Sequence, residues 1–308
     1  MSPVFRPHHA LGRTGFRATQ LGIGDLADRS RPLAECVATL RRALDAGLNV
    51  VDTAPNYEDG YSEQIVGEAL RGRRDGVFVI DKIDHLHEPV AAQIEQSLAR
   101  LRLDHVDLFV FHACSRGEDL QKLMAPGGGF AQLAAQIEQG RARFRGLSSH
   151  HPDVLRTAIA AGVCDVVMFP LGPFADRRYE TEILPLAKAR GVGTVCFKTF
   201  GAGKLLADTE GYQRPLAPHP HGRVRPKLTV AQCVHYTLTL DPDVALLGLS
   251  DPPEQDAAWA AARTFTPLSQ AMLATTRAAA ALAIADKGDV WWNPPPGDSQ
   301  PSGSDQRP

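Results

Sequence analysis

The sequence predicts an α/β fold, and more narrowly a parallel, eight-stranded (β/α)8 or TIM barrel. Short apolar runs alternate with longer amphipathic segments along most of the 308 residues. Most of these runs are continuous rather than alternating in polarity, as expected where helices cover both faces of a parallel sheet. Eight such runs, each followed by a helical segment, close most simply into a barrel.

The eight candidate strands follow one another without a break that would mark a domain boundary. They are residues 18–24, 49–52, 76–82, 106–112, 142–148, 165–170, 192–198 and 243–250. The helical segments between them carry apolar residues three and four positions apart, which places these residues on one stripe. The clearest segments are residues 32–48, 90–101, 151–162, 180–191 and 229–240.

Three segments lie outside this repeat. Residues 5–18 are expected to form a short N-terminal hairpin that closes the bottom of the barrel. Residues 207–227 form a long Pro-, His- and Arg-containing loop after the seventh strand, which predicts a lid or substrate wall at the top face. We therefore predict one barrel domain over residues 1–290 and a flexible, disordered Pro/Ser/Gly-rich tail over 291–308.

Composition excludes several classes of protein. The chain is 44% hydrophobic and 22% charged, with a net charge of −2, which allows a large core and argues against nucleic acid as a partner. It has no apolar leader and no 18-residue apolar run, so we expect no membrane association and a cytoplasmic location. The five cysteines are scattered without a CxxC pattern, as expected for reduced thiols.

Polar residues end several of the predicted strands. In a parallel barrel these ends meet at one rim, where the chemistry of such barrels takes place. Asp52, Lys82 and His112 end the second, third and fourth strands, and Tyr57 follows Asp52 by five residues. We expect these four side chains to lie together.

The four residue types suit the reduction of a carbonyl group. A tyrosine has an ordinary pKa of about 10, and a nearby ammonium lowers it toward neutrality. A carboxylate beside the lysine keeps the ammonium charged and oriented. A neutral histidine can donate a hydrogen bond that polarises the carbonyl oxygen. Such a site can protonate an oxygen while a hydride reaches its carbon.

The segments DTAPNYEDGYSEQIVGEAL, VFVIDK and LARLRLDHVDLFVFH closely resemble the aldo-keto reductases, from about Gly12 to Trp259. The resemblance implies a TIM barrel and hydride transfer between a nicotinamide cofactor and an aldehyde or ketone. It implies that Tyr57 is the general acid, that Asp52 and Lys82 tune it, and that His112 orients the carbonyl. The chain is most similar to bacterial members, but has no cysteine after Cys233 and so lacks the C-terminal iron–sulfur module of some relatives.

The resemblance also implies a cofactor stretched across the top of the barrel. It places Gly24 and Asp25 near the nicotinamide ribose, Ser148 and Ser149 at the carboxamide, and Phe197 against the nicotinamide face. Asp52 is also counted among the cofactor-binding residues. The pyrophosphate and adenosine ends are assigned to Lys198, Thr199, Gly201, Gly203, Gly248, Ser250, Glu254 and Gln255.

Three positions depart from the family pattern. Ser149 stands where the family usually has Asn, and Met168 and Phe169 occupy the sixth strand where Gln or Asn is frequent. The loop after the eighth strand has three carboxylates and no basic residue before Arg263, which would suit NAD(H). NADP(H) is nevertheless favoured as the family default, with Lys204 or an arginine of the long loop as a source of positive charge.

Two other functions remain open from the sequence. One is a non-catalytic barrel that binds the cofactor as a sensor or regulatory subunit, and the other is a sugar (aldose) 1-dehydrogenase. The expected partner in every enzymatic case is a small carbonyl or sugar-like molecule, and the sequence does not indicate an oligomeric state. We assign no metal site, because the loop histidines have no supporting carboxylate pattern; they are the pairs His85/His87, His150/His151 and His219/His221.

Overall fold

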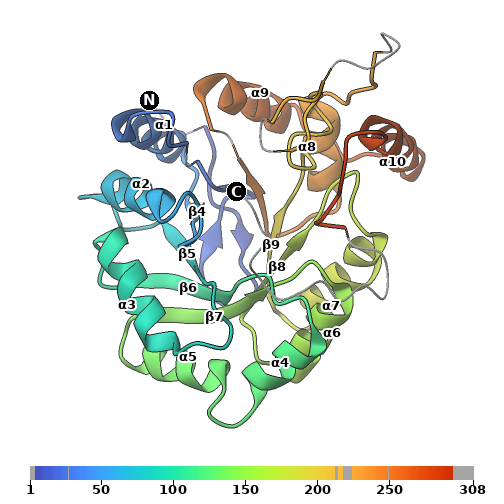
Figure 1. The fold of residues 1–308 in the computed structure, drawn as a ribbon. Coiled ribbons are helices and arrows are strands. Elements are labelled where there is room, and N and C mark those ends of the chain that lie inside the picture. The colour runs from blue at the N-terminus through green and yellow to red at the C-terminus, as the bar shows by residue number, and fades with distance from the viewer. Residues whose placement is uncertain (1–3, 27, 212–213, 218–223, 249, 294–308) are drawn as a thin grey trace.

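The computed structural model describes residues 4–26, 28–211, 214–217, 224–248 and 250–293. Eight parallel strands close into a barrel in the order β10-β3-β4-β5-β6-β7-β8-β9 (Figure 1). The strands are β3 (Leu21–Ile23), β4 (Val50–Asp52), β5 (Phe78–Ile83), β6 (Val106–Phe111), β7 (Ala142–Ser148), β8 (Val166–Pro170), β9 (Gly193–Phe197) and β10 (Val244–Leu247). The predicted fold class is confirmed, and each predicted strand contains or overlaps an observed one.

Helices form the outer ring of the barrel in Figure 1. Each barrel strand is followed by at least one helix, as a (β/α)8 barrel requires. The helical elements are α1 (Leu33–Asp45), α2 (Tyr61–Leu70), α3 (Val90–Leu101), α4 (Gly117–Met124), α5 (Gly129–Glu138), α6 (Pro152–Ala161), η1 (Tyr179–Ile183), α7 (Leu184–Ala189), α8 (Val230–Thr239), α9 (Pro252–Arg263) and α10 (Gln270–Ile284).

The barrel interior is filled by apolar side chains, so the barrel is a packed core and not a pore. Alternate residues of the strands supply this interior, while the residues between them face the helices. The interior cluster comprises Leu11, Ala18, Val50, Phe78, Ile80, Leu108, Val110, Val166, Met168, Val195, Val244 and Leu246.

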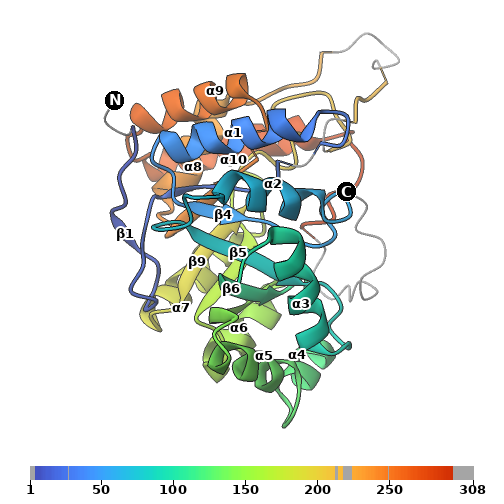
Figure 2. The same ribbon diagram turned by 90° about the vertical axis from the view of Figure 1, so that its left-hand side faces the viewer.

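The predicted N-terminal hairpin is also confirmed. Strands β1 (His9–Ala10) and β2 (Arg17–Ala18) pair in antiparallel fashion. The hairpin delivers Leu11 to the interior cluster, and Phe16 packs against Phe78 with ring centroids 5.0 Å apart. Figure 2 shows it at one end of the barrel, away from the loops that follow the strands. The hairpin therefore closes the bottom and leaves the opposite rim open for function.

The chain beyond α10 packs onto the loop that follows β9. Trp292 is fully buried there beside Leu205 and Ala280, and its Nε1 donates a hydrogen bond to the carbonyl oxygen of Phe174, at 3.2 Å. Packed structure thus continues to at least Trp292. Of the tail predicted over residues 291–308, residues 294–308 lie outside the described residues.

No helix in the described part of the chain combines the length and the apolar character that crossing a bilayer requires.

Candidate active site

The four residues singled out from the sequence meet at the rim where the strands end. Asp52 is the last residue of β4, Lys82 lies near the end of β5, and His112 follows β6 directly. The backbone N–H of His112 donates to the carbonyl oxygen of Ile83, which continues the ladder between β5 and β6 by one more bond. Asp52 pairs with Ile80 and Lys82 with Val110, so each of these side chains lies two residues beyond the pairing partner of the one before. The tilt of barrel strands offsets this stagger and brings the three side chains to one rim.

Lys82 is the centre of this group. Its side chain is 2% exposed, and Nζ donates to Asp52 Oδ1 and to the carbonyl oxygen of Thr53, both at 2.7 Å. The same ammonium lies 4.4 Å from the centroid of the Tyr57 ring. The Tyr57 and His112 rings meet edge to face, with centroids 5.9 Å apart and an interplanar angle of 81°. The structure therefore brings all four residues together.

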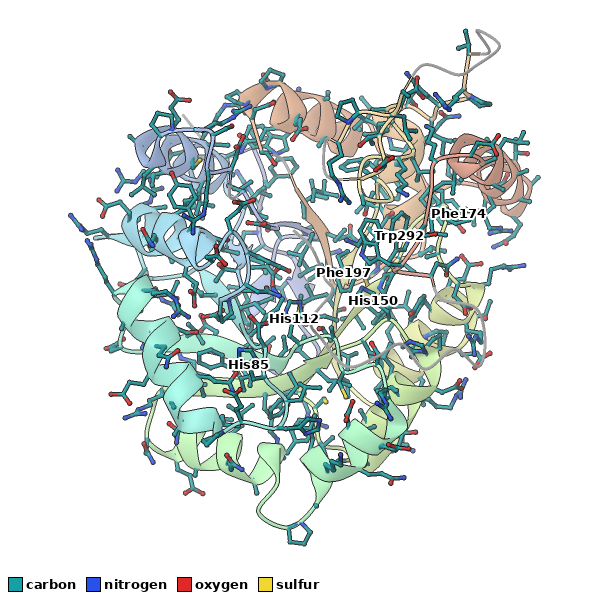
Figure 3. The ribbon with its side chains drawn as sticks, in the orientation of Figure 1. His85, His112, His150, Phe174, Phe197 and Trp292 are labelled. Atoms are coloured by element: carbon teal, nitrogen blue, oxygen red, sulfur yellow. The ribbon has the colours of Figure 1, made fainter. Side chains whose placement is uncertain are left out.

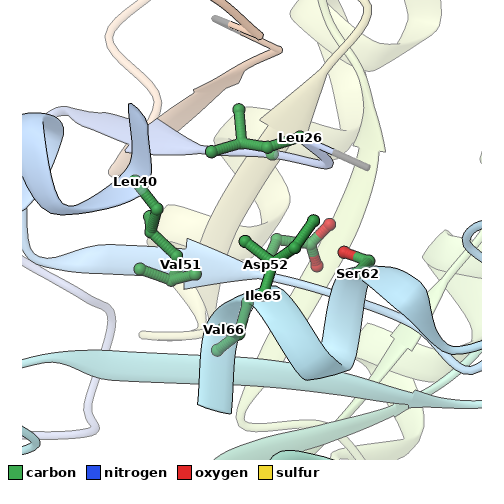
Figure 4. Close-up of a pocket in the computed structure, with 8 residues that line it drawn as sticks. Leu26, Leu40, Val51, Asp52, Ser62, Ile65 and Val66 are labelled. Atoms are coloured by element: carbon green, nitrogen blue, oxygen red, sulfur yellow. The ribbon is translucent and has the colours of Figure 1, made fainter. Parts of the chain in front are cut away.

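Asp52 lies in an unusually apolar setting for a carboxylate. Figure 4 shows it in a narrow pocket lined mainly by apolar side chains, among them Leu26, Val51 and Ile65. Burial raises the pKa of Asp52, and the charge and hydrogen bond of Lys82 act against that rise. The two buried charges are therefore stabilised chiefly by each other.

The turn that carries Tyr57 has an uncommon backbone. Glu58, Asp59 and Gly60 all adopt the left-handed region, with φ of 48°, 51° and 81°. Two successive non-glycine residues in this region cost free energy, so the surrounding structure must hold them. Arg29 does so through a hydrogen bond from Nε to the carbonyl oxygen of Glu58, at 2.9 Å. The turn places Tyr57 above Lys82 and starts α2 at Tyr61.

Asp84 is a site residue that our sequence reasoning missed. Its Oδ1 lies 2.5 Å from Nδ1 of His112, and its Oδ2 accepts the backbone N–H of Asn56 at 2.9 Å. Asp84 thus ties the imidazole to the turn that carries Tyr57. The available signal was its position two residues after Lys82, which places both side chains on the same face of β5 and its extension.

Two buried acidic residues lie on the side of β5 that faces the helices and support the site from there. Asp81 faces away from the barrel axis and is fully buried, and its Oδ1 accepts the backbone N–H of Lys82 at 2.8 Å. Burial and then the charge of Glu63 raise the pKa of Asp81 well above its ordinary value. Glu63, on α2, is fully buried and pairs with Arg100 of α3. These contacts fix α2 and α3 against β5.

The loop after β9 has the chemistry expected of a phosphate cradle. Lys198 lies with its Nζ 5.4 Å from the Trp291 ring centroid and 5.9 Å from that of Trp292. Within the described part of the chain, the buried Oγ1 of Thr199 has no hydrogen-bond partner. Gly201 and Gly203 have positive φ values of 55° and 85°, which lets the main chain turn tightly beside it. A hydroxyl, an ammonium and a glycine-rich turn are a donor set that fits a pyrophosphate.

The two serines assigned to the carboxamide each accept a hydrogen bond from a nearby backbone N–H. Ser148 Oγ accepts the backbone N–H of Ala113 at 2.8 Å. Ser149 Oγ accepts the backbone N–H of His151 at 3.0 Å, in a local turn. The side chain that reaches the rim instead is His150, whose ring lies edge-on to Phe197 with centroids 5.5 Å apart.

Figure 3 shows how these rings are placed over the barrel. His112, His150 and Phe197 lie near the centre of the view, with Phe174 and Trp292 beyond Phe197. Burial, followed by the charges of Lys198, His112 and His151, lowers the pKa of His150 to about 3. His150 is therefore neutral at physiological pH and can both donate and accept a hydrogen bond. Our sequence reasoning considered it only as half of a histidine pair.

The residues assigned to the ribose and adenosine ends lie along the same rim, around β3 and β10. Gly24 and Asp25 are half-buried directly after β3, Gly248 is exposed after β10, and Ser250 donates its backbone N–H to Glu254 Oε2 at 2.7 Å. Gln255 is different: it is fully buried, and its Nε2 donates to the carbonyl oxygen of Thr39, at 2.9 Å. The amide of Gln255 therefore joins α9 to α1.

A basic residue that the sequence did not suggest reaches the loop after β10. Arg31, from the segment before α1, pairs with Asp28 at 3.1 Å and lies 3.8 Å from Asp251. Lys204, by contrast, is fully buried, and its Nζ donates to the carbonyl oxygens of Lys287 and Asp289. Two of the three N–H donors of Lys204 therefore bind the C-terminal segment, and the partly exposed Arg31 is the better source of positive charge at the rim.

The described residues contain no group of three or more His, Cys, Asp and Glu side chains that could hold a metal ion. His219 and His221 lie outside the described residues.

A closed parallel barrel that gathers a carboxylate, an ammonium, a phenol and an imidazole at the carboxyl ends of its strands has the architecture of a barrel enzyme. A model of the Aldo/keto reductase family matches residues 19–276. The chain belongs to this family and is an oxidoreductase.

Individual relatives are distant. The chain is 28% identical over 241 residues to L-galactose dehydrogenase of Arabidopsis thaliana, covering 73% of this chain and 74% of that protein. It is 27% identical over 223 residues to the aldo-keto reductase YhdN of Bacillus subtilis, covering 66% of this chain and 65% of that protein, slightly less than two thirds of its length.

Solved structures agree on the fold. The holo form of the aldo-keto reductase AKR11C1 from Bacillus halodurans superposes with a TM-score of 0.67 at 24% identity, covering 91% of this chain and 96% of that one. An aldo-keto reductase from Klebsiella pneumoniae in complex with NADPH gives a TM-score of 0.68 at 22% identity, covering 88% and 94%.

Proposed function

We propose that this chain is an NADP(H)-dependent carbonyl oxidoreductase that reduces an aldehyde or ketone, or oxidises the matching alcohol. The observation that carries the proposal is the position of the Lys82 ammonium, 2.7 Å from Asp52 Oδ1 and 4.4 Å from the Tyr57 ring centroid. An ammonium in this place favours the phenolate, so Tyr57 can release its proton during the reaction. Only a tyrosine with such a neighbour is a competent acid near neutral pH.

In this proposal, each residue has one task. Tyr57 delivers the proton to the carbonyl oxygen, and His112 contributes a second hydrogen bond to the same oxygen. Lys82 supports the phenolate that remains, and Asp52 keeps the ammonium in place. A reduced nicotinamide bound on the rim supplies the hydride to the carbonyl carbon.

The donor set of the rim fits such a cofactor. Thr199 offers a buried hydroxyl without a partner among the described residues, and it lies between Lys198 and the turn at Gly201. Phe197 presents an aromatic ring at the end of β9 for the nicotinamide. His150 lies beside Phe197 as a neutral donor and acceptor, so we assign it to the carboxamide together with the hydroxyl of Ser148.

We favour NADP(H) over NAD(H). The acidic loop after β10 seemed to argue for a free ribose 2′-hydroxyl, but Arg31 lies 3.8 Å from Asp251 and offsets its charge. A guanidinium is a good partner for a 2′-phosphate. The Klebsiella relative was crystallised with NADPH.

A sugar dehydrogenase is the second candidate, because the Arabidopsis relative is named L-galactose dehydrogenase. The same side chains would serve alcohol oxidation, so the direction depends on the substrate and the cofactor ratio. A non-catalytic sensor would need none of the Tyr57, Lys82 and His112 arrangement, and we do not favour it.

The test is a titration of the purified protein with NADPH and with NADH, followed by tryptophan fluorescence. We expect NADPH to bind at micromolar concentration and more tightly than NADH, because of Arg31. Turnover is then assayed with aldehydes, ketones and aldoses using the preferred cofactor. Failure of both cofactors to bind below about millimolar, an affinity of only about 4 kcal/mol, would contradict the proposal.

A further inference from the structure

We propose that Asp84 is a positioning residue that fixes a proton on Nδ1 of His112, so that His112 donates a hydrogen bond to the substrate only as an imidazolium. This inference rests on the proposed function, because it concerns the same carbonyl oxygen. It replaces the neutral histidine donor that we expected from the sequence with a charged one.

Asp84 is present as an ionised carboxylate. Both of its oxygens face hydrogen-bond donors: Oδ2 receives the backbone N–H of Asn56, and Oδ1 lies 2.5 Å from His112 Nδ1. The two side chains are 11% and 12% exposed, so water has little access to the contact. Burial alone would raise the pKa of Asp84, but the hydrogen bond to His112 and the charges of His112 and Lys82 bring it below its ordinary value.

The contact with Asp84 determines which nitrogen of the His112 ring carries the proton. A carboxylate only accepts hydrogen bonds, so Nδ1 of His112 must carry the proton in this contact. A neutral imidazole has a single N–H, and Nε2 is then left with a lone pair. A carbonyl oxygen also only accepts, so a neutral His112 held in this way cannot bind it. His112 must gain a second proton, on Nε2, before it can act as the donor.

Charged groups of both signs face this pair. The carboxylates of Asp84 and Asp52 attract a positive charge on His112. The ammonium of Lys82 opposes it but is already paired with Asp52, and the Tyr57 ring adds no formal charge while protonated. His150 stays neutral, as described above, and so adds no repulsion at physiological pH.

An imidazolium is a stronger donor than a neutral ring, and its charge stabilises the negative oxygen that forms as the hydride arrives. The reduction should therefore slow as the pH rises and His112 loses its second proton. Loss of the Asp84 carboxylate should remove this dependence, because the imidazole could then move its single proton to Nε2 and donate as a neutral ring.

The experiment uses the full chain with 15N-labelled histidine. NMR shifts of the ring nitrogens report which atom carries the proton, and a His112→Asn variant assigns the signals. We expect the neutral form of His112 to be protonated on Nδ1 in the wild type. We also expect kcat/KM for carbonyl reduction to fall with the same midpoint as the imidazolium signal.

Two variants test the cause. Asp84→Asn should move the proton of neutral His112 to Nε2, flatten the pH profile and lower kcat about 10- to 100-fold, the loss expected for one charge-assisted hydrogen bond. Asp104→Asn is the matched control, because Asp104 Oδ1 contacts Nδ1 of His105 at 2.7 Å outside the site. This control should change neither the His112 signals nor the activity.

A wild-type His112 with its neutral proton on Nε2 would overturn the inference, even if Asp84→Asn did not fold. An unchanged pH profile in a folded Asp84→Asn variant would overturn it as well. A protein that shows the Nδ1 proton but reduces no carbonyl and binds no cofactor would refute the proposed function while leaving the position of the proton established.

Discussion

Tyr57 is the residue on which the proposed chemistry depends most. We expect Tyr57→Phe to lower turnover by about 100- to 10,000-fold, the usual contribution of a general acid. Cofactor affinity should stay within about twofold, since only the transition-state interaction is lost. Single-turnover hydride transfer and fluorescence titration measure the two quantities separately.

Tyr61→Phe is the control for this variant. Tyr61 lies four residues further along, at the start of α2, and its hydroxyl donates to the carbonyl oxygen of Arg31 at 3.0 Å. Its loss should cost some stability but leave turnover nearly unchanged. Equal turnover losses in the two variants, or none in Tyr57→Phe, would show that another group supplies the proton.

His150 gives a second prediction at the scale of one residue. If it binds the carboxamide, His150→Ala should weaken NADPH binding by about 5- to 13-fold, the loss of one hydrogen bond of about 1–1.5 kcal/mol. Binding of 2′-phospho-ADP-ribose, which lacks the nicotinamide, should not change. A calorimetric titration of both ligands makes the comparison. Equal weakening of both would instead indicate a general distortion of the rim.

Single residues were predictable from the sequence where they end a strand, and less so elsewhere. Asp52, Lys82 and His112 terminate apolar runs, so the topology alone placed them together. Asp84 lay in a loop, and its partner depends on where the backbone turns after β5. Arg31 reaches Asp251 from more than two hundred residues away, a contact that spacing along the chain does not encode.

At the scale of elements, the segment after α10 is held by two buried lysines. Lys204 Nζ donates to the carbonyl oxygens of Lys287 and Asp289, and Lys287 Nζ donates to those of Lys204 and Ala207. Both ammonium groups are fully buried, and burial lowers the pKa of each. These four hydrogen bonds join the C-terminal segment to the loop after β9.

We therefore expect Lys204→Met or Lys287→Met to release the segment. Each change leaves two buried carbonyl oxygens unpaired, at a cost of about 1–3 kcal/mol. Hydrogen–deuterium exchange should rise in residues 285–293 and in the loop after β9. Lys188→Met is the control, because its exposed pair with Asp241 contributes about 0–1 kcal/mol. Unchanged exchange in both buried-lysine variants would mean that Trp292 alone anchors the segment.

Strands were easier to predict than helices. Their continuous apolar runs follow from burial on both faces, and the ladder then fixes the register. The segment over residues 180–191 is helical as predicted, but it begins with a π-helical turn, η1, before α7. Pro185 has no N–H for the α-helical bond to the carbonyl oxygen of Thr181, and a wider turn accommodates that gap.

At the scale of the whole molecule, burial of Asp81 makes stability depend on pH. The pKa of Asp81 in the fold lies well above its ordinary value of 3.8. The folded chain therefore keeps a proton that the unfolded chain has already released, and stability is lost as the pH rises from about 4 toward the raised pKa. Each unit of difference corresponds to about 1.4 kcal/mol.

Asp81→Asn removes this loss, because the amide needs no proton and its oxygen can still accept the backbone N–H of Lys82. We expect the variant to be more stable than the wild type, by more at pH 8 than at pH 5. Urea unfolding at the two pH values measures this. Asp75→Asn, at an exposed position before β5, should be neutral at both. A variant destabilised equally at both pH values would show that Asp81 is needed as an acid.

The overall architecture was the most predictable level, because the alternation of strands and helices allows few topologies. The sequence indicates only part of the packing of the chain end. Trp291 and Trp292 fall in the predicted tail, although two adjacent tryptophans also suggest apolar anchors for the last helix, and Trp292 is fully buried. Its burial depends on a hollow formed by residues of the β9 loop and α10, which no local pattern describes.

The closed strand order also has a consequence for how the protein is made. β10 pairs with both β3 and β9, so the barrel is completed by one of the last strands to leave the ribosome. Until then, β3 and β9 present unpaired edges, and the apolar interior has an open side. A nascent chain stalled before residue 244 is therefore a natural substrate for chaperones. Closure of the barrel therefore depends on β10, which is synthesised after the other seven barrel strands.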